Sequence, residues 1–145
     1  PIAQTNRLKS YNENRKAGIK INRPALTEEH KKSISEGTKK YLKRTIKHGG
    51  ARYSFTACEF INKLNEEKGW NLQHAENGGE IKVGNYYLDG YDSNLNIAFE
   101  YDEKRHYNSN GELNEKDLKK MNYIKEKLNC RFFRYNESLN ELKEF

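Results

Sequence analysis

Apolar residues are distributed unevenly along this chain of 145 residues, and this limits where a hydrophobic core can form. Between Pro1 and about Ile46 they are sparse, and they are too few to build a core. From Arg52 onward they recur in patterns typical of helices and strands. The sequence therefore predicts one small folded domain over residues 52–145, with residues 1–48 as an attached arm.

The net charge of +6 is also divided unevenly between these two parts. Residues 1–48 carry 13 Lys and Arg against 4 Asp and Glu, a net charge of +9, whereas residues 49–145 have a net charge of −3. A basic segment beside a mildly acidic domain is typical of an arm that binds a polyanion. The composition of the arm also fits a solvated tail without a fixed structure.

Two further features of the sequence concern membrane association and the cellular compartment of the protein. No apolar run reaches the roughly 18–20 residues that a membrane span requires, so no membrane partner is expected. Cys58 and Cys130 lie in apolar surroundings without metal-ligand spacing, which predicts reduced thiols in a cytoplasmic protein. Because the chain begins with proline, we expect it to be a piece of a longer protein.

One helix is predicted within the arm, over about residues 25–46. Thr27 is suited to cap it, and Glu28 and Glu29 suit its first turn. Gly37 costs about 1 kcal/mol relative to Ala, so this helix is marginal alone in water. The basic side chains expected to contact DNA phosphates are Lys31, Lys32, Lys39, Lys40, Lys43 and Arg44.

After a linker at residues 48–51, the domain is predicted to contain both helices and strands. One helix is expected near residues 54–69, where Ser54 and Thr56 are both candidate N-caps and Thr56 with Glu59 fits a capping box. A second helix is expected over residues 114–128. Strands are expected over residues 70–75, 81–88, 95–101 and 130–135, with a short helix after residue 138. This order predicts a small α/β domain whose sheet is partly covered.

Acidic residues gather at the ends of two apolar strands. In YYLDGYDSNLNIAFEYDEKRHY, residues 86–107, Asp89 follows the first strand, and Glu100 and Asp102 end the next. Glu100 and Asp102 have the same parity, so they share one side of their strand. Carboxylates this close repel one another and, when desolvated, need protons or a cation. We predict that all three bind Mg²⁺, which Mn²⁺ can replace, and that this ion activates a water.

Beside a DNA-binding arm, this chemistry points to hydrolysis of phosphodiester bonds. His106 is the expected general base or acid, since imidazole exchanges protons near neutral pH. Lys104 is an alternative group that would stabilise the charge developing on the phosphate.

Asp89 followed by Glu100, Asp102 and His106 resembles the PD-(D/E)XK nuclease core in its very-short-patch-repair-like branch. The resemblance implies the α/β fold of that superfamily, a mixed sheet flanked by helices, over residues 52–136. Members of this branch often have E-x-D-x-x-x-H. Typical restriction enzymes of the superfamily have lysine at the position of Asp102.

A phage homing endonuclease group within this branch is described by the pattern EDxHD. The catalytic residues that this pattern implies here are Glu59, Asp89, His106 and Asp117. In the arm, TEEHKKSISEGTKK resembles the nuclease-associated modular helix of phage and intron-borne homing endonucleases, which implies a helix along the DNA minor groove. Together these resemblances imply a site-specific endonuclease acting on long double-stranded DNA, in the host bacterial cytoplasm if phage-encoded, with a homodimer on DNA as one arrangement.

Each singled-out residue also has an ordinary structural explanation. Asp89 suits a turn before glycine, and Glu59 suits a capping box. Asp117 suits the first turn of a helix, while His106 and Lys104 fit a solvated loop. All of these structural explanations would have to hold at once in a chain that also has a basic arm. Their combination therefore favours the nuclease interpretation.

Three other functions are compatible with parts of the pattern. A DNA-binding protein can keep this fold without the chemistry, although it has no reason to retain mutually repelling carboxylates. A mismatch or nicking repair endonuclease would share the fold, whereas the arm favours recognition of a long site by shape. An RNA-binding module needs stacking aromatic residues on an exposed sheet face. Here the residues on the exposed face of the predicted strand are rich in carboxylates, which repel phosphate unless a metal ion intervenes.

Overall fold

The computed structural model describes residues 13, 16–17, 25–50 and 52–145. The chain divides into two compact units, Pro1–Tyr41 and Leu42–Phe145. Most of the predicted arm before residue 25, and Ala51 of the predicted linker, lie outside the described residues. Within the described parts of the chain, no helix is long and apolar enough to cross a membrane.

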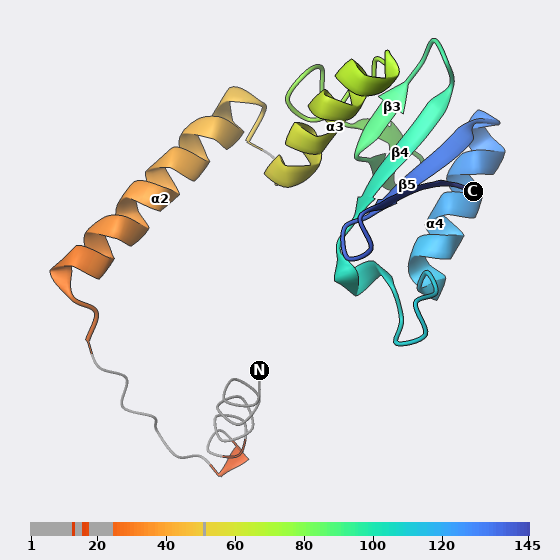
Figure 1. Cartoon of the computed structure of the whole chain (residues 1–145). Helices are drawn as coiled ribbons and strands as arrows, with labels where there is room; N and C mark the ends of the chain where they lie inside the picture. Colours follow the sequence, from red (N-terminus) through yellow and green to blue (C-terminus); the bar gives the residue numbers. More distant parts are fainter. Residues whose placement is uncertain (1–12, 14–15, 18–24, 51) are drawn as a thin grey trace. The chain divides into compact units, whose positions relative to one another are not determined.

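Helix α2 (Glu28–Lys47) occupies the predicted position in the arm (Figure 1). The Thr27 hydroxyl accepts a hydrogen bond from the His30 backbone N–H at 3.2 Å, and two acidic residues follow in the first turn. The predicted cap and extent of this helix are confirmed.

Helix α3 (Phe55–Lys68) is capped at both ends by local sequence. The Ser54 hydroxyl accepts from a backbone N–H in the first turn at 3.1 Å, and Gly69 closes the helix with a left-handed φ of 67°. Ser54, one of the two predicted N-cap candidates, is therefore confirmed, whereas Thr56 lies inside the helix and its predicted capping box with Glu59 is wrong.

Helix α4 (Glu115–Leu128) begins and ends where the sequence predicts. The Asn114 side chain accepts from the Asp117 N–H at 2.8 Å, and Asn129 adopts a left-handed φ of 46° at the C-terminus.

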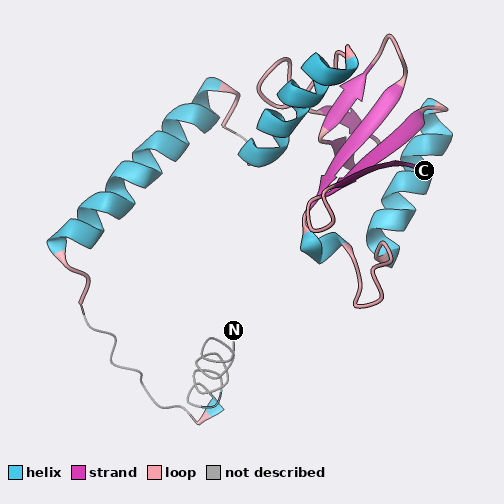
Figure 2. Ribbon diagram, in the orientation of Figure 1, coloured by secondary structure: helices cyan, strands magenta, loops and turns pink. Residues whose placement is uncertain are grey.

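The described residues form two sheets (Figure 2). Their strands are β1 (Ile81–Val83), β2 (Tyr86–Leu88), β3 (Gly90–Asp92), β4 (Ile97–Asp102), β5 (Arg131–Asn136) and β6 (Glu141–Glu144). Strands β1 and β2 form a hairpin, and the larger sheet has the order β3-β4-β5-β6. Strands β4 and β5 are parallel and connected through α4, while the other neighbours are antiparallel. The predicted small α/β fold is thus confirmed, and its larger sheet is mixed.

Three predicted elements differ in the structure. Residues 81–88 form the β1–β2 hairpin, because Gly84 turns the chain with a left-handed φ of 60°. Residues 70–75 contribute only a bridge at Gln73, since side chains of neighbouring residues satisfy much of their backbone. The residues after 138 form β6, which pairs with β5, instead of a helix.

The larger sheet packs against α3 on one face and α4 on the other (Figure 2). Phe99 and Phe133 lie in the core beside α3, whereas Ala98 and Phe132 lie in the core beside α4. Because side chains alternate along a strand, the β4 residues after Ala98 on the α4 face are carboxylates. This change from apolar to acidic positions the candidate site.

Candidate active site

Two of the predicted carboxylates, Glu100 and Asp102, follow Ala98 along the α4 face of β4. The Glu100 residue is 4% exposed and Asp102 is 0% exposed. Carboxylates so far from water need a cationic partner or a proton. The structure gives the two residues different partners.

Asp89 lies at the bend between β2 and β3, one residue beyond the paired Gly90 and Phe99. The same antiparallel register places it beside Glu100 on β4. Its Oδ2 accepts a hydrogen bond from the Tyr101 N–H at 2.9 Å. Burial raises the pKa of Asp89, although the Tyr101 hydrogen bond opposes this shift.

Glu100 faces both Asp89 and a lysine on α4. Burial, and then the Asp89 charge, raise the pKa of Glu100 to about 8. Lys120 Nζ lies 2.8 Å from Glu100 Oε1 and favours the charged form. Burial and Asp89 also raise the pKa of Glu80, so the carboxylates here share a poorly solvated space. The sequence prediction missed Lys120, although it lies three residues after Asp117 on the same side of α4.

Asp102 is bound by a buried arginine from the parallel strand β5. Arg134 Nε and Nη2 lie 2.6 Å and 2.7 Å from the two carboxylate oxygens of Asp102. The Tyr107 hydroxyl donates a third hydrogen bond to Asp102 at 2.9 Å. Both oxygens of Asp102 are therefore engaged by protein groups, and its role as a metal ligand stays a prediction. The prediction also missed Arg134, since no local pattern in β5 indicates its partner.

His106 and Asp117, both predicted site residues, are brought together by the fold. His106 ends the 3₁₀ helix η1 (Lys104–His106), and its Nδ1 lies 3.0 Å from Asp117 Oδ2 in the first turn of α4. The same Nδ1 is 4.0 Å from Asp102 Oδ1. A cavity of about 310 Å³ opens beside this pair, with Arg105 and Lys116 in its lining.

Glu59 is not part of this group. It belongs to α3, which packs on the other face of the sheet, and its Oε1 lies 3.2 Å from Arg44 Nη1. Arg44 Nε also pairs with Glu76 at 2.7 Å. These two ion pairs engage the Arg44 guanidinium and give Glu59 a structural partner, and DNA binding by Arg44 stays a prediction.

The other predicted basic residues are exposed. Lys104 begins η1 and its side chain is exposed. On α2, Lys31 pairs with Glu28 at 2.7 Å, an exposed contact that stabilises a helix only slightly. Spacings of seven and four residues place Lys32, Lys39 and Lys43 along one side of α2.

The donor set bears on whether a metal ion fits. Among the described residues, no three His, Cys, Asp or Glu side chains are grouped so as to hold one. Asp89 and Glu100 nevertheless form an adjacent, poorly solvated carboxylate pair. Mg²⁺ is commonly held by one or two carboxylates, with water and substrate phosphate completing its shell. The pair therefore fits Mg²⁺ in the presence of substrate.

Comparison of the chain with protein-family models, curated proteins and solved structures found no match. The candidate site is therefore interpreted from its own geometry.

Proposed function

We propose that this chain is a Mg²⁺-dependent endonuclease that hydrolyses phosphodiester bonds in long double-stranded DNA. Its fold would be that of the PD-(D/E)XK superfamily, within the EDxHD homing endonuclease group, and Mn²⁺ would replace Mg²⁺. The observation that carries this proposal is the poorly solvated Asp89–Glu100 pair on the sheet face that also holds the bonded His106–Asp117 pair.

In this proposal the side chains of the site have different roles. Asp89 and Glu100 would hold the metal ion, which when bound would polarise the phosphate and lower the pKa of a water. Asp117 holds His106 through Nδ1, which leaves Nε2 to accept or give a proton. Lys120 holds the Glu100 carboxyl in place through their 2.8 Å contact.

The arm supplies affinity without base specificity. Lys32, Lys39 and Lys43 along α2 would contact phosphates and release counterions from DNA. Two copies acting together on DNA would allow cleavage of both strands. The free thiols of Cys58 and Cys130 fit a reducing compartment, and we place the activity in the cytoplasm.

Plasmid cleavage tests the proposal directly. Supercoiled DNA carrying intron-insertion sites is incubated with the protein and Mg²⁺, Mn²⁺ or EDTA. We expect nicked or linear product only with metal, and none from Asp89→Asn, which keeps the shape of the side chain. The exposed α4 variant Glu126→Gln is the matched control and should cleave normally. Cleavage by Asp89→Asn at the normal rate would remove Asp89 from the site.

A second function is favoured by the Asp102–Arg134 pair. Asp102 stands where typical PD-(D/E)XK restriction enzymes have a lysine, and here it is bound by Arg134. The chain would then be a DNA-binding protein that has lost the chemistry. DNA retention without product under every metal condition would select this alternative.

A further inference from the structure

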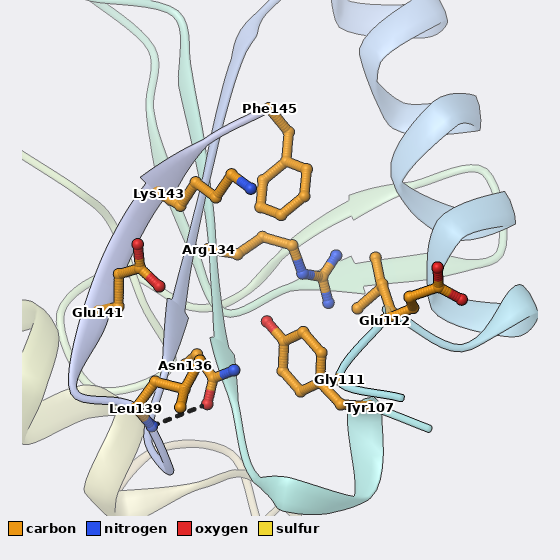
Figure 3. A pocket seen from close by; sticks show the side chains of 10 residues that line it. Tyr107, Gly111, Glu112, Arg134, Asn136, Leu139, Glu141, Lys143 and Phe145 are labelled. Carbon is orange, nitrogen blue, oxygen red and sulfur yellow. Dashed lines mark hydrogen bonds between the residues drawn. The ribbon is translucent and has the colours of Figure 1, made fainter. Parts of the chain in front are cut away.

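A second cavity lies on the α4 face of the sheet, between β6 and the loop after η1 (Figure 3). Its volume is about 390 Å³, within the range of small-ligand sites. Arg134 and Tyr107 line it, and these residues also bind Asp102. Asp102 in turn lies 4.0 Å from His106 Nδ1, which connects this cavity to the His106–Asp117 pair through one carboxylate.

The polar feature of this cavity is an incompletely bonded arginine. Arg134 is 1% exposed, and two of its nitrogens donate to Asp102. Its third nitrogen, Nη1, has no hydrogen-bond partner among the described residues. Figure 3 shows the guanidinium directed into the space between Tyr107 and Phe145. A buried donor without an acceptor destabilises the fold, and a ligand acceptor would satisfy it.

The charges favour a neutral ligand. Asp102 already balances the Arg134 charge through two hydrogen bonds. Apart from Arg134, the charged lining residues are two acidic ones, Glu112 and Glu141, and one basic one, Lys143. A phosphate dianion would meet this excess of carboxylates, whereas an uncharged oxygen or ring nitrogen would not.

The walls favour a planar apolar ring. Tyr107, Leu113, Leu139 and Phe145 line the cavity together with the polar groups. Aromatic and aliphatic walls with one buried donor match a nucleobase, which has two flat faces and an acceptor on its edge. Enzymes that do chemistry on a base hold the extruded base in pockets of this kind.

We propose that this cavity receives a single unpaired nucleobase of the DNA substrate, with an acceptor on the base bonded to Arg134 Nη1. This inference rests on the proposed function and adds a substrate contact next to the site of cleavage. Because Asp102 links Arg134 to the neighbourhood of His106, a seated base would hold the adjoining backbone near that histidine.

Nucleoside titration of the full chain tests the pocket without metal or cleavage. Methyl-labelled leucines are followed by NMR, with Leu113 and Leu139 inside the cavity and Leu95 outside it. We expect saturable shifts of the two cavity leucines at about millimolar deoxynucleoside, since one hydrogen bond and partial burial give weak affinity. Deoxyribose 5-phosphate, which lacks the base, should leave them unmoved.

Two matched variants locate the binding. Leu139 is 67% exposed and Leu95 is 50% exposed, so tryptophan at either position leaves the core intact. Leu139→Trp should weaken nucleoside binding at least about tenfold by filling the cavity, whereas Leu95→Trp should not change it. Arg134→Lys, where the variant stays folded, should also weaken nucleoside binding. The single side-chain nitrogen of lysine cannot bond both Asp102 and the base in the way that the three nitrogens of arginine can.

Three outcomes would overturn the proposal: no saturable shift of either cavity leucine, equal shifts with deoxyribose 5-phosphate, or equal weakening by Leu95→Trp. The second outcome would identify a phosphate subsite instead. Nucleoside binding without plasmid cleavage would refute the nuclease and keep the pocket. Cleavage that is normal in Leu139→Trp, without nucleoside binding to the wild type, would refute the pocket and keep the nuclease.

Discussion

Replacement of Glu100 by glutamine should change how the stability of this protein depends on pH. Burial and the neighbouring Asp89 charge raise the pKa of Glu100 from 4.5 to about 8. Glutamine has nearly the same shape and carries no charge at any pH. The variant therefore isolates the free energy of placing a carboxylate at this position.

The magnitude follows from proton linkage. Below pH 4.5 the folded and unfolded chains both carry the proton on Glu100, so ionisation of this residue has no effect on stability. Between pH 4.5 and about 8 only the unfolded chain gives up this proton, so rising pH lowers the free energy of unfolding by roughly 1 kcal/mol per pH unit. At pH 7 the loss is about 3 kcal/mol, and above pH 8 it is constant.

Urea unfolding at several pH values measures this effect. Trp70 packs against Phe133 with ring centroids 4.9 Å apart, so its fluorescence reports the loss of the core. We expect Glu100→Gln to gain stability over the wild type as pH rises from 5 to 8, and then to hold that difference. Glu126→Gln, at an exposed position of α4, should show a difference that does not vary with pH.

Magnesium extends the same assay. Above pH 8 the ion should stabilise the wild type by binding ionised Asp89 and Glu100, and should stabilise Glu100→Gln much less. A difference between wild type and Glu100→Gln that is independent of pH, or that grows as pH falls, would refute the argument from burial.

Three further changes have defined outcomes. Arg134→Met should lower the free energy of unfolding by about 3–5 kcal/mol because it leaves Asp102 charged and buried, and adding Asp102→Asn should restore most of it in urea unfolding. His106→Gln should slow plasmid cleavage about 10²–10⁴-fold with unchanged DNA retention in a filter-binding assay, and loss of retention would indicate a binding role instead. Deleting residues 1–41 should weaken DNA binding and flatten its dependence on salt, and equal salt slopes would exclude the arm from phosphate contact.

Local chemistry was sufficient to predict most of the helices. Thr27 and Asn129 are residue types that satisfy exposed backbone groups at helix ends, so their positions mark the ends of α2 and α4. The alternation along β4 likewise predicted that Glu100 and Asp102 share a face. Each of these features depends on residues only a few positions apart.

The strands were less predictable because pairing decides them. Residues 81–88 have the composition of one strand, yet Gly84 allows a hairpin beside the larger sheet. The residues of β6 show no strong strand pattern and are ordered by antiparallel pairing with β5. Such pairing depends on contacts between separate segments, which composition does not encode.

The sequence by itself determined that the chain has a basic arm, a small α/β domain, and carboxylates at the ends of its strands. Only the tertiary structure decided the role that each carboxylate can take. The β4–β5 pairing brings Arg134 to Asp102, and the packing of α4 brings Lys120 to Glu100. Partners 20 and 32 residues apart meet only when the sheet and helix pack, and burial then makes each carboxylate depend on its cationic partner.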